Sequence, residues 1–83
     1  MTQYLFMCQS LTYAQKSVKL LERSGIYGTV VKAPQELSGR GCAYAVSVRR
    51  NAAEAAGILR KSDLISGKIY EKTGSGEYRE AGL

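Results

Sequence analysis

The sequence of 83 residues contains no histidine and no tryptophan, and it has only two cysteines. Without histidine, the chain cannot form the Ser-His or Cys-His pairs that activate many enzyme nucleophiles. The cysteines, Cys8 and Cys42, are too few for a disulfide scaffold, and they lie too far apart in the sequence to suggest a zinc site within one chain. We therefore expect no metal and no cofactor, and we expect both thiols to be reduced.

Long apolar runs are also missing. No run approaches the roughly 18 residues that a membrane-spanning helix needs. The first residues carry neither a basic flank nor a long apolar core, so the pattern predicts no signal peptide. We therefore expect a cytoplasmic protein that does not contact a membrane.

Negative charge is scarce relative to positive charge. Lysine and arginine total 12, aspartate and glutamate total 7, and the formal net charge is +5. Such a balance permits binding to phosphates, nucleic acids or acidic proteins. Because the positive residues are spread along the chain, nucleic-acid binding is disfavoured, and we keep it only as a third alternative.

The apolar residues alternate between the spacing of strands and the spacing of helices. We expect a first helix after Ser10, a suitable N-cap, and Gly25 is a suitable helix stop. We expect a second helix after Asn51, with Glu54 completing a capping box, and it runs to about Lys61. Short apolar or β-branched stretches predict four strands, at residues 3–8, 26–33, 42–48 and 65–71.

The predicted order of elements is strand-helix-strand-strand-helix-strand, which is the ferredoxin-like βαββαβ pattern of an α+β fold. The crossover rule makes the first two strands parallel and leaves a gap between them that the third strand fills. We therefore expect a four-stranded antiparallel sheet in the order 4-1-3-2, with both helices on one face. Residues 1–72 form this single domain, and the polar, glycine-rich stretch 73–83 is expected to be a frayed tail.

This topology brings the two cysteines to one end of the sheet. Cys8 ends the first strand, and Cys42 begins the third strand, its antiparallel neighbour. The first helix begins at the same end, and its free N–H groups favour anions. Lys32 closes the second strand there, and Arg40 precedes Cys42 by two residues. Because positive groups lower the pKa of a thiol, we expect a reactive thiolate at this end.

The segment before Cys42 supplies further candidate residues. Gly39 and Gly41 make the chain mobile and let the sulfur of a partner approach closely. Together with Ser38, they complete the residues that we expect to stabilise an anion. Plainer interpretations remain open, because a cysteine often acts as a small buried apolar residue, which applies most to Cys8, and Ser38 is typical of a turn.

Several short motifs occur together in this chain. They are the helix end at residues 20–26 (LLERSGI), Pro34 followed by Glu36-Leu37-Ser38, the pair Gly41-Cys42 leading into the apolar stretch 43–46, and the closing pair Ile69-Tyr70. In these motifs the chain resembles the small bacterial domains grouped as selenium/sulfur (Se/S) carrier-like proteins. The resemblance runs from Tyr4 to about Tyr70, and its most specific part is the stretch from Pro34 to Cys42.

The resemblance implies a small cytosolic carrier in which Cys42 holds sulfur or selenium as a persulfide-type adduct. A donor protein, such as a cysteine desulfurase, loads the thiol, and an acceptor protein unloads it. Cys8 is the candidate resolving thiol. We therefore expect a carrier rather than a turnover enzyme.

A different class of function remains open, namely a non-catalytic binding or regulatory module that acts through dimerisation or through protein partners. Ferredoxin-like domains commonly pair through an exposed sheet face or edge. The small residues Ala43, Ala45 and Ser47 share one face of the third strand, where they would allow close packing of a second copy. The fold by itself does not choose between these functions.

Overall fold

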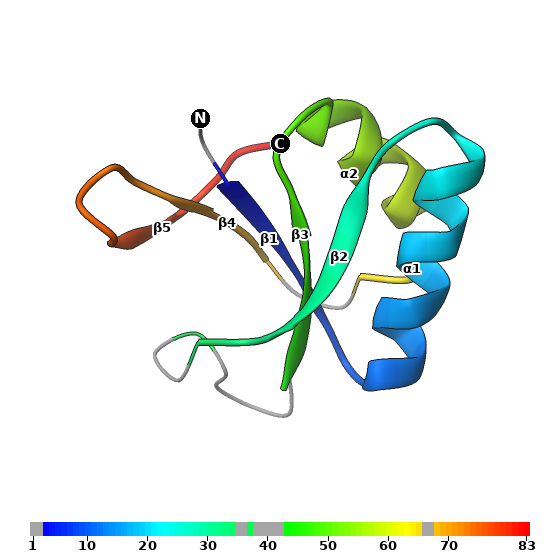
Figure 1. The fold of residues 1–83 in the computed structure, drawn as a ribbon, viewed down its shortest axis with the longest axis horizontal. Helices are drawn as coiled ribbons and strands as arrows, with labels where there is room; N and C mark the ends of the chain where they lie inside the picture. The colour runs from blue at the N-terminus through cyan, green and yellow to red at the C-terminus, as the bar shows by residue number, and fades with distance from the viewer. Residues whose placement is uncertain (1–2, 35–36, 38–42, 66–67) are drawn as a thin grey trace.

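The computed structural model describes residues 3–34, 37, 43–65 and 68–83 of the chain (Figure 1). The elements are, in order, β1 (Gln3–Cys8), α1 (Leu11–Arg23), β2 (Gly28–Lys32), β3 (Tyr44–Val48), α2 (Ala52–Lys61), β4 (Ile69–Lys72) and β5 (Tyr78–Glu80). The strands form one sheet in the order β2-β3-β1-β4-β5, and every neighbouring pair is antiparallel. The α+β class with two helices and an antiparallel sheet is therefore confirmed.

The prediction of a four-stranded sheet is wrong, because the sheet has a fifth strand. β5 pairs with β4 and lies in the stretch 73–83, where we expected a frayed tail. The glycine-rich part of that stretch forms a turn instead, in which the amide of Thr73 donates to the carbonyl of Glu77 at 2.7 Å and Gly76 has a φ of +87°. Glycine adopts such a positive φ without steric cost, so the composition that suggested fraying suits a tight hairpin equally well.

The end of the chain is held against the rest of the molecule beyond β5. The amide of Ala81 donates to the carbonyl of Ile69 at 2.7 Å, and the Arg60 side chain donates to the carbonyl oxygen of Leu83. Ala81 and Leu83 also pack against the main core as partly buried residues. These contacts join the final residues both to β4 and to α2.

Both helices cover the same face of the sheet, and the main core lies between these two layers (Figure 1). Alternate residues of each strand point to this face, as the period of two requires. The helices contribute small and branched side chains, so the two layers approach closely. The fully buried members of this core include Phe6, Ala14, Leu21, Val46, Val48, Ala55 and Leu59.

The ends of α1 agree with the sequence pattern. The hydroxyl of Ser10 accepts a hydrogen bond from the amide of Tyr13 at 3.3 Å, which is the expected N-cap. At the other end, Gly25 has a φ of +79°, and the amide of Ile26 donates to the carbonyl of Leu21 at 2.8 Å. This is a Schellman ending, in which a left-handed residue satisfies carbonyls of the last turn.

The start of α2 differs from the prediction. Asn51 does precede the helix, but its backbone is left-handed, with a φ of 57°, and its side chain makes no capping hydrogen bond. The expected capping box with Glu54 is therefore wrong. A left-handed residue at this position turns the chain sharply out of β3, and asparagine tolerates that conformation better than most residues do.

A second, smaller cluster lies on the sheet face that carries no helix. Leu5, Met7 and Ala45 are almost fully buried there, although they alternate with the core residues of β1 and β3. Tyr70 and Tyr78 from the β4–β5 hairpin cover this cluster, together with Val31, Ala33 and Leu37. The centre of the sheet is thus buried on both faces.

Candidate functional site

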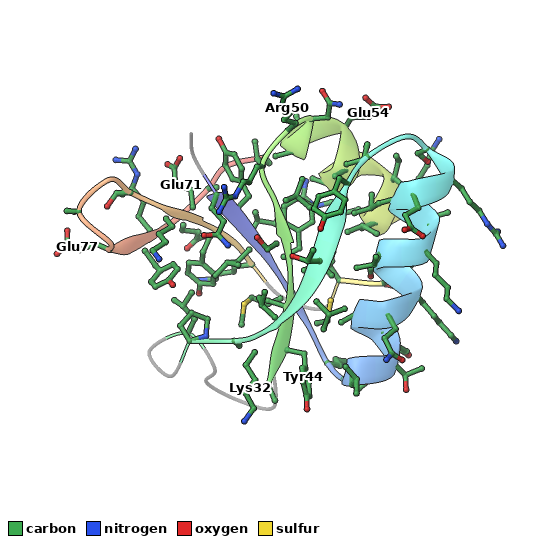
Figure 2. The ribbon with its side chains drawn as sticks, viewed as in Figure 1. Lys32, Tyr44, Arg50, Glu54, Glu71 and Glu77 are labelled. Atoms are coloured by element: carbon green, nitrogen blue, oxygen red, sulfur yellow. The ribbon has the colours of Figure 1, made fainter. Side chains whose placement is uncertain are left out.

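One cross-strand row of residues marks the end of the sheet where we expected the thiols. Cys8 on β1 lies directly opposite Tyr44 on β3, and Lys32 on β2 lies opposite the same Tyr44. Figure 2 shows Lys32 and Tyr44 together at the lower end of the sheet. Directly opposed residues of antiparallel strands point to the same face, so the row begins in the core at Cys8 and ends in solvent at Lys32.

The α1 helix begins at this same end. Only two residues separate the end of β1 from the first residue of α1, and Figure 1 shows the helix starting beside the lower ends of β1 and β3. Ser10 and the first turn are exposed, and that turn contains no acidic residue. The positive end of the helix dipole therefore faces the same region as the Lys32 ammonium group.

Cys8 is not a surface thiol. Its side chain is 0 % exposed and belongs to the main core between the sheet and the helices. The sulfur lies 3.5 Å from the carbonyl oxygen of Phe6. This burial favours the interpretation of Cys8 as a small apolar core residue, because a resolving thiol must reach the sulfur that it attacks.

The other thiol and its neighbours, namely Ser38, Gly39, Arg40, Gly41 and Cys42, lie outside the described residues. The structure does describe how the chain leaves β2 and enters β3. The amide of Leu37 donates to the carbonyl of Pro34 at 2.9 Å, so the chain turns directly after β2.

On the β3 side, the amide of Ala33 donates to the carbonyl of Ala43 at 2.9 Å, which extends the β2–β3 pairing by one step. Leu37 packs against the helix-free face of the sheet. The segment that contains the proposed carrier thiol therefore starts and ends on firmly held backbone, and Cys42 precedes Tyr44 by only two residues.

A second feature, which the sequence analysis missed, lies at the opposite end of the sheet. A pocket of about 750 Å³ extends over the start of β1, along β2 as far as Val31, and over the end of β3. Its polar lining includes Gln3, Thr29, Ser47, Arg49 and Arg50. The one sequence motif that indicates this pocket is Arg49-Arg50-Asn51 after a strand. The sequence analysis interprets only Asn51, as a helix cap.

Two further findings concern the described part of the chain. Within it, no group of three or more histidine, cysteine, aspartate or glutamate side chains is arranged to hold a metal ion. Neither of the two described helices has the length and apolar character that a membrane span requires.

The fold and this end of the sheet define a small α+β domain with a cysteine in the connection between two neighbouring antiparallel strands. Residues 3–71 match the family model described as "Putative Se/S carrier protein-like". Since the match covers most of the 83 residues, the chain belongs to this family. Comparison with curated proteins and with solved structures gave no match.

Proposed function

We propose that the protein carries sulfur or selenium on the thiol of Cys42. The family membership is the observation that supports this function most directly, because the matched residues include Cys42 and the segment before it. The absence of histidine supports a carrier rather than an enzyme that activates its own nucleophile. The carrier would act between a donor protein and an acceptor protein.

The proposed loading step is a sulfur transfer that needs no oxidant. The Cys42 thiolate attacks the outer sulfur of a persulfide on the donor, for example a cysteine desulfurase. A new S–S bond forms on Cys42, the S–S bond of the donor breaks, and the donor cysteine leaves as a thiolate. In unloading, a nucleophile of the acceptor attacks the outer sulfur, and Cys42 returns to its thiolate form.

The surroundings that the structure describes suit an anionic sulfur at this end. Lys32 places an exposed positive charge in the row that contains Tyr44, and the α1 N-terminus adds the positive end of its dipole. We propose that Arg40 adds a second cation, and that Ser38, Gly39 and Gly41 allow a partner to approach the sulfur. These four residues enter the proposal through their place in the sequence beside Cys42.

The proposed cycle uses Cys42 alone. A role for Cys8 as a resolving thiol would require its sulfur, which is 0 % exposed, to leave the core and reach the loaded sulfur. A carrier that passes its cargo directly to an acceptor has no need of this step. We therefore assign Cys8 to the core, and the experiment below tests the assignment.

The test is mass spectrometry of the protein after incubation with a cysteine desulfurase and L-cysteine. We expect the mass of the wild type to rise by one sulfur atom, and peptide analysis to place that sulfur on Cys42. The Cys8→Ala variant should accept sulfur to the same extent. Absence of added sulfur in the wild type, or equal loading of a Cys42→Ser variant, would contradict the proposal.

The alternative of a dimerising module has less support from the described residues. Ala45 is 0 % exposed and lies under the second cluster, and Ser47 is 8 % exposed and accepts a hydrogen bond from the Gln3 side chain at 2.6 Å. These two residues are thus already covered by the chain itself. The third residue of the set, Ala43, is exposed, so a dimer would have to use Ala43 or another surface. Measurement of the molecular mass in solution distinguishes a dimer from a monomer.

A further inference from the structure

The pocket lies mainly at the other end of the sheet from the row of Cys8, Tyr44 and Lys32. Gln3 lines the pocket and begins β1, whereas Cys8 ends the same strand. At a rise of about 3.4 Å per residue, the two residues lie roughly 17 Å apart along the strand. A ligand beside Gln3 would therefore lie far from Cys8, and the pocket calls for a separate explanation.

The volume and the lining suit an organic molecule rather than a single small ion. At about 750 Å³, the pocket falls within the range of roughly 300–1,000 Å³ that is typical of small-molecule sites. Ile26 and Val31 contribute apolar surface, and Thr29 and Ser47 contribute hydroxyl groups. No aspartate or glutamate is among the described residues that line it.

Two consecutive arginines supply the charge. Arg49 and Arg50 both line the pocket and are both exposed. Among the described residues, salt bridges join Lys68 to Glu80 and Arg79 to Glu71, and neither pocket arginine takes part in one. A guanidinium group binds phosphate through two parallel hydrogen bonds, so this pair can hold a phosphate group at the rim of the pocket.

The start of α2 adds to the positive potential at the same rim. Asn51 lines the pocket and immediately precedes α2, and its side chain leaves the first turn of the helix uncapped. The positive end of a helix dipole favours anions. Figure 2 shows Arg50 at this end of the molecule, with Glu54 on the first turn of the helix beyond it. Glu54 is not among the residues that line the pocket.

Tyr27 provides a planar surface near Arg49, since these two residues adjoin the paired residues Gly28 and Val48. Its side chain is 79 % exposed, which is unusual for a tyrosine next to an apolar core, and it lines the pocket between α1 and β2. An exposed aromatic ring offers a face on which a flat heterocycle can stack, and such stacking contributes about 1–3 kcal/mol per base in nucleic-acid binding. A phosphate on the arginines would place a linked heterocycle within the same pocket.

We propose that this pocket binds a mononucleotide, with the phosphate on Arg49 and Arg50 and the base against Tyr27. Gln3 and Thr29 also line the pocket and offer polar groups to the sugar or the base, and Gln3 already donates to the Ser47 hydroxyl at 2.6 Å. Among the described residues, two arginines and no lysine line the pocket, which favours a single nucleotide over a nucleic-acid strand, whose backbone needs a longer positive path.

The test is titration of the isotope-labelled full chain with AMP and UMP, followed by amide chemical shifts in NMR spectra. We expect at least one nucleotide to shift the amides of Tyr27, Thr29, Ser47 and Arg49, while the amides of Cys8 and Tyr44 stay in place. Adenosine and inorganic phosphate, tested separately, should each bind at least tenfold more weakly than AMP. Equal binding of phosphate alone would overturn the proposal in favour of a simple anion site.

Three variants locate the contacts. The substitutions Arg49→Gln and Arg50→Gln should each weaken nucleotide binding at least fivefold, and Tyr27→Ala should weaken nucleotide binding but not phosphate binding. Lys16→Gln removes the same charge from an exposed position on α1 and should leave the affinity unchanged. An equal loss in the Lys16→Gln variant would overturn the proposal, since the effect would then reflect net charge.

Two more outcomes would overturn it as well. One is the absence of any shift with millimolar AMP and UMP, and the other is binding of a single-stranded RNA oligomer without binding of either mononucleotide. The Cys42→Ser variant should bind nucleotide as the wild type does. The result therefore stands apart from the sulfur-transfer assay, and either proposal can fail without the other.

Discussion

Cys8, the last residue of β1, lies directly opposite Tyr44, the first residue of β3. This pairing places the fully buried Cys8 next to β3. In the sequence, one residue separates Cys42 from the start of that strand. Lys32 extends the same row on β2. The proposed carrier segment therefore connects to a part of the sheet in which three strands hold one another in register.

The first prediction concerns the charge of Lys32. The Lys32→Gln substitution should slow the alkylation of Cys42 by iodoacetamide at neutral pH about two- to fourfold at low ionic strength. The reason is that a unit positive charge roughly 5–10 Å from a thiolate in water stabilises it by about 0.4–0.8 kcal/mol. The rate is measured by mass spectrometry of the Cys42 peptide at several times.

Lys19→Gln is the matched control, because Lys19 is an exposed lysine further along α1. It should change the rate by less than Lys32→Gln does. Added salt should reduce the difference between Lys32→Gln and the wild type, since screening weakens interactions between exposed charges. Equal rates in Lys32→Gln and the wild type at low salt would show that this lysine does not act on the thiol.

The second prediction concerns the core position of Cys8. Cys8→Ala should lower the free energy of unfolding by about 1 kcal/mol through lost packing, whereas Cys8→Ser should lower it by about 2–3 kcal/mol because a hydroxyl group enters an apolar core. Urea unfolding followed by circular dichroism measures both. A serine variant as stable as the wild type would place this side chain in contact with water, contrary to its burial.

The third prediction compares two glycines with opposite roles. Gly25→Ala should lower the free energy of unfolding by about 1 kcal/mol, because the Schellman ending of α1 holds residue 25 at a φ of +79°. Gly57→Ala should raise it by about 0.5–1 kcal/mol, because this glycine lies inside α2.

In both glycine variants the added methyl group meets no atom within 4 Å, so packing clashes do not contribute to either result. The pair of measurements therefore isolates the backbone conformation. Thermal and urea unfolding should rank the three proteins in the order Gly57→Ala, wild type, Gly25→Ala. A stabilising Gly25→Ala substitution would contradict the described end of α1.

The fourth prediction concerns the β4–β5 hairpin. Removal of residues 78–83 should lower the free energy of unfolding by about 2–4 kcal/mol, because it deletes the β5 ladder and the packing of Ala81 and Leu83 against the core. Arg79→Gln is the control, and it should cost less than about 1 kcal/mol, since the Arg79–Glu71 ion pair is largely exposed on the arginine side. A truncated chain as stable as the full chain would mean that the tail is frayed, as the composition had suggested.

Elements with strong local signals agree with the sequence prediction. Ser10 caps the start of α1 with its side chain, and the backbone of Gly25 ends the helix. Both effects involve residues that are close in the chain. The alternation of β3 is also local, so it correctly separates Val46 and Val48, in the main core, from Ala45, on the other face. The candidate residues Cys8 and Lys32 lie at the same end of the sheet because each ends a strand beside Tyr44, and the crossover rule makes β1 and β2 parallel.

Other features depended on contacts between distant residues. Tyr78 pairs with β4 and packs against the cluster of Leu5 and Met7, and these contacts stabilise β5. Nothing within the stretch 73–83 indicates them. Asn51 has the composition of an N-cap, but the turn out of β3 imposes a left-handed backbone. The pocket combines residues from three strands and a helix start, so no short motif reveals it.

The sequence alone determined the two helices, the alternating faces of β3 and the family, because each of these depends on spacing along the chain. Only the tertiary structure decided that Cys8 is buried, that a fifth strand completes the sheet, and that Tyr27 and Arg49 border one pocket. The physical reason is that burial and pairing are set by which surfaces meet. Those contacts join residues that are tens of positions apart, and they produce no periodic pattern in the sequence.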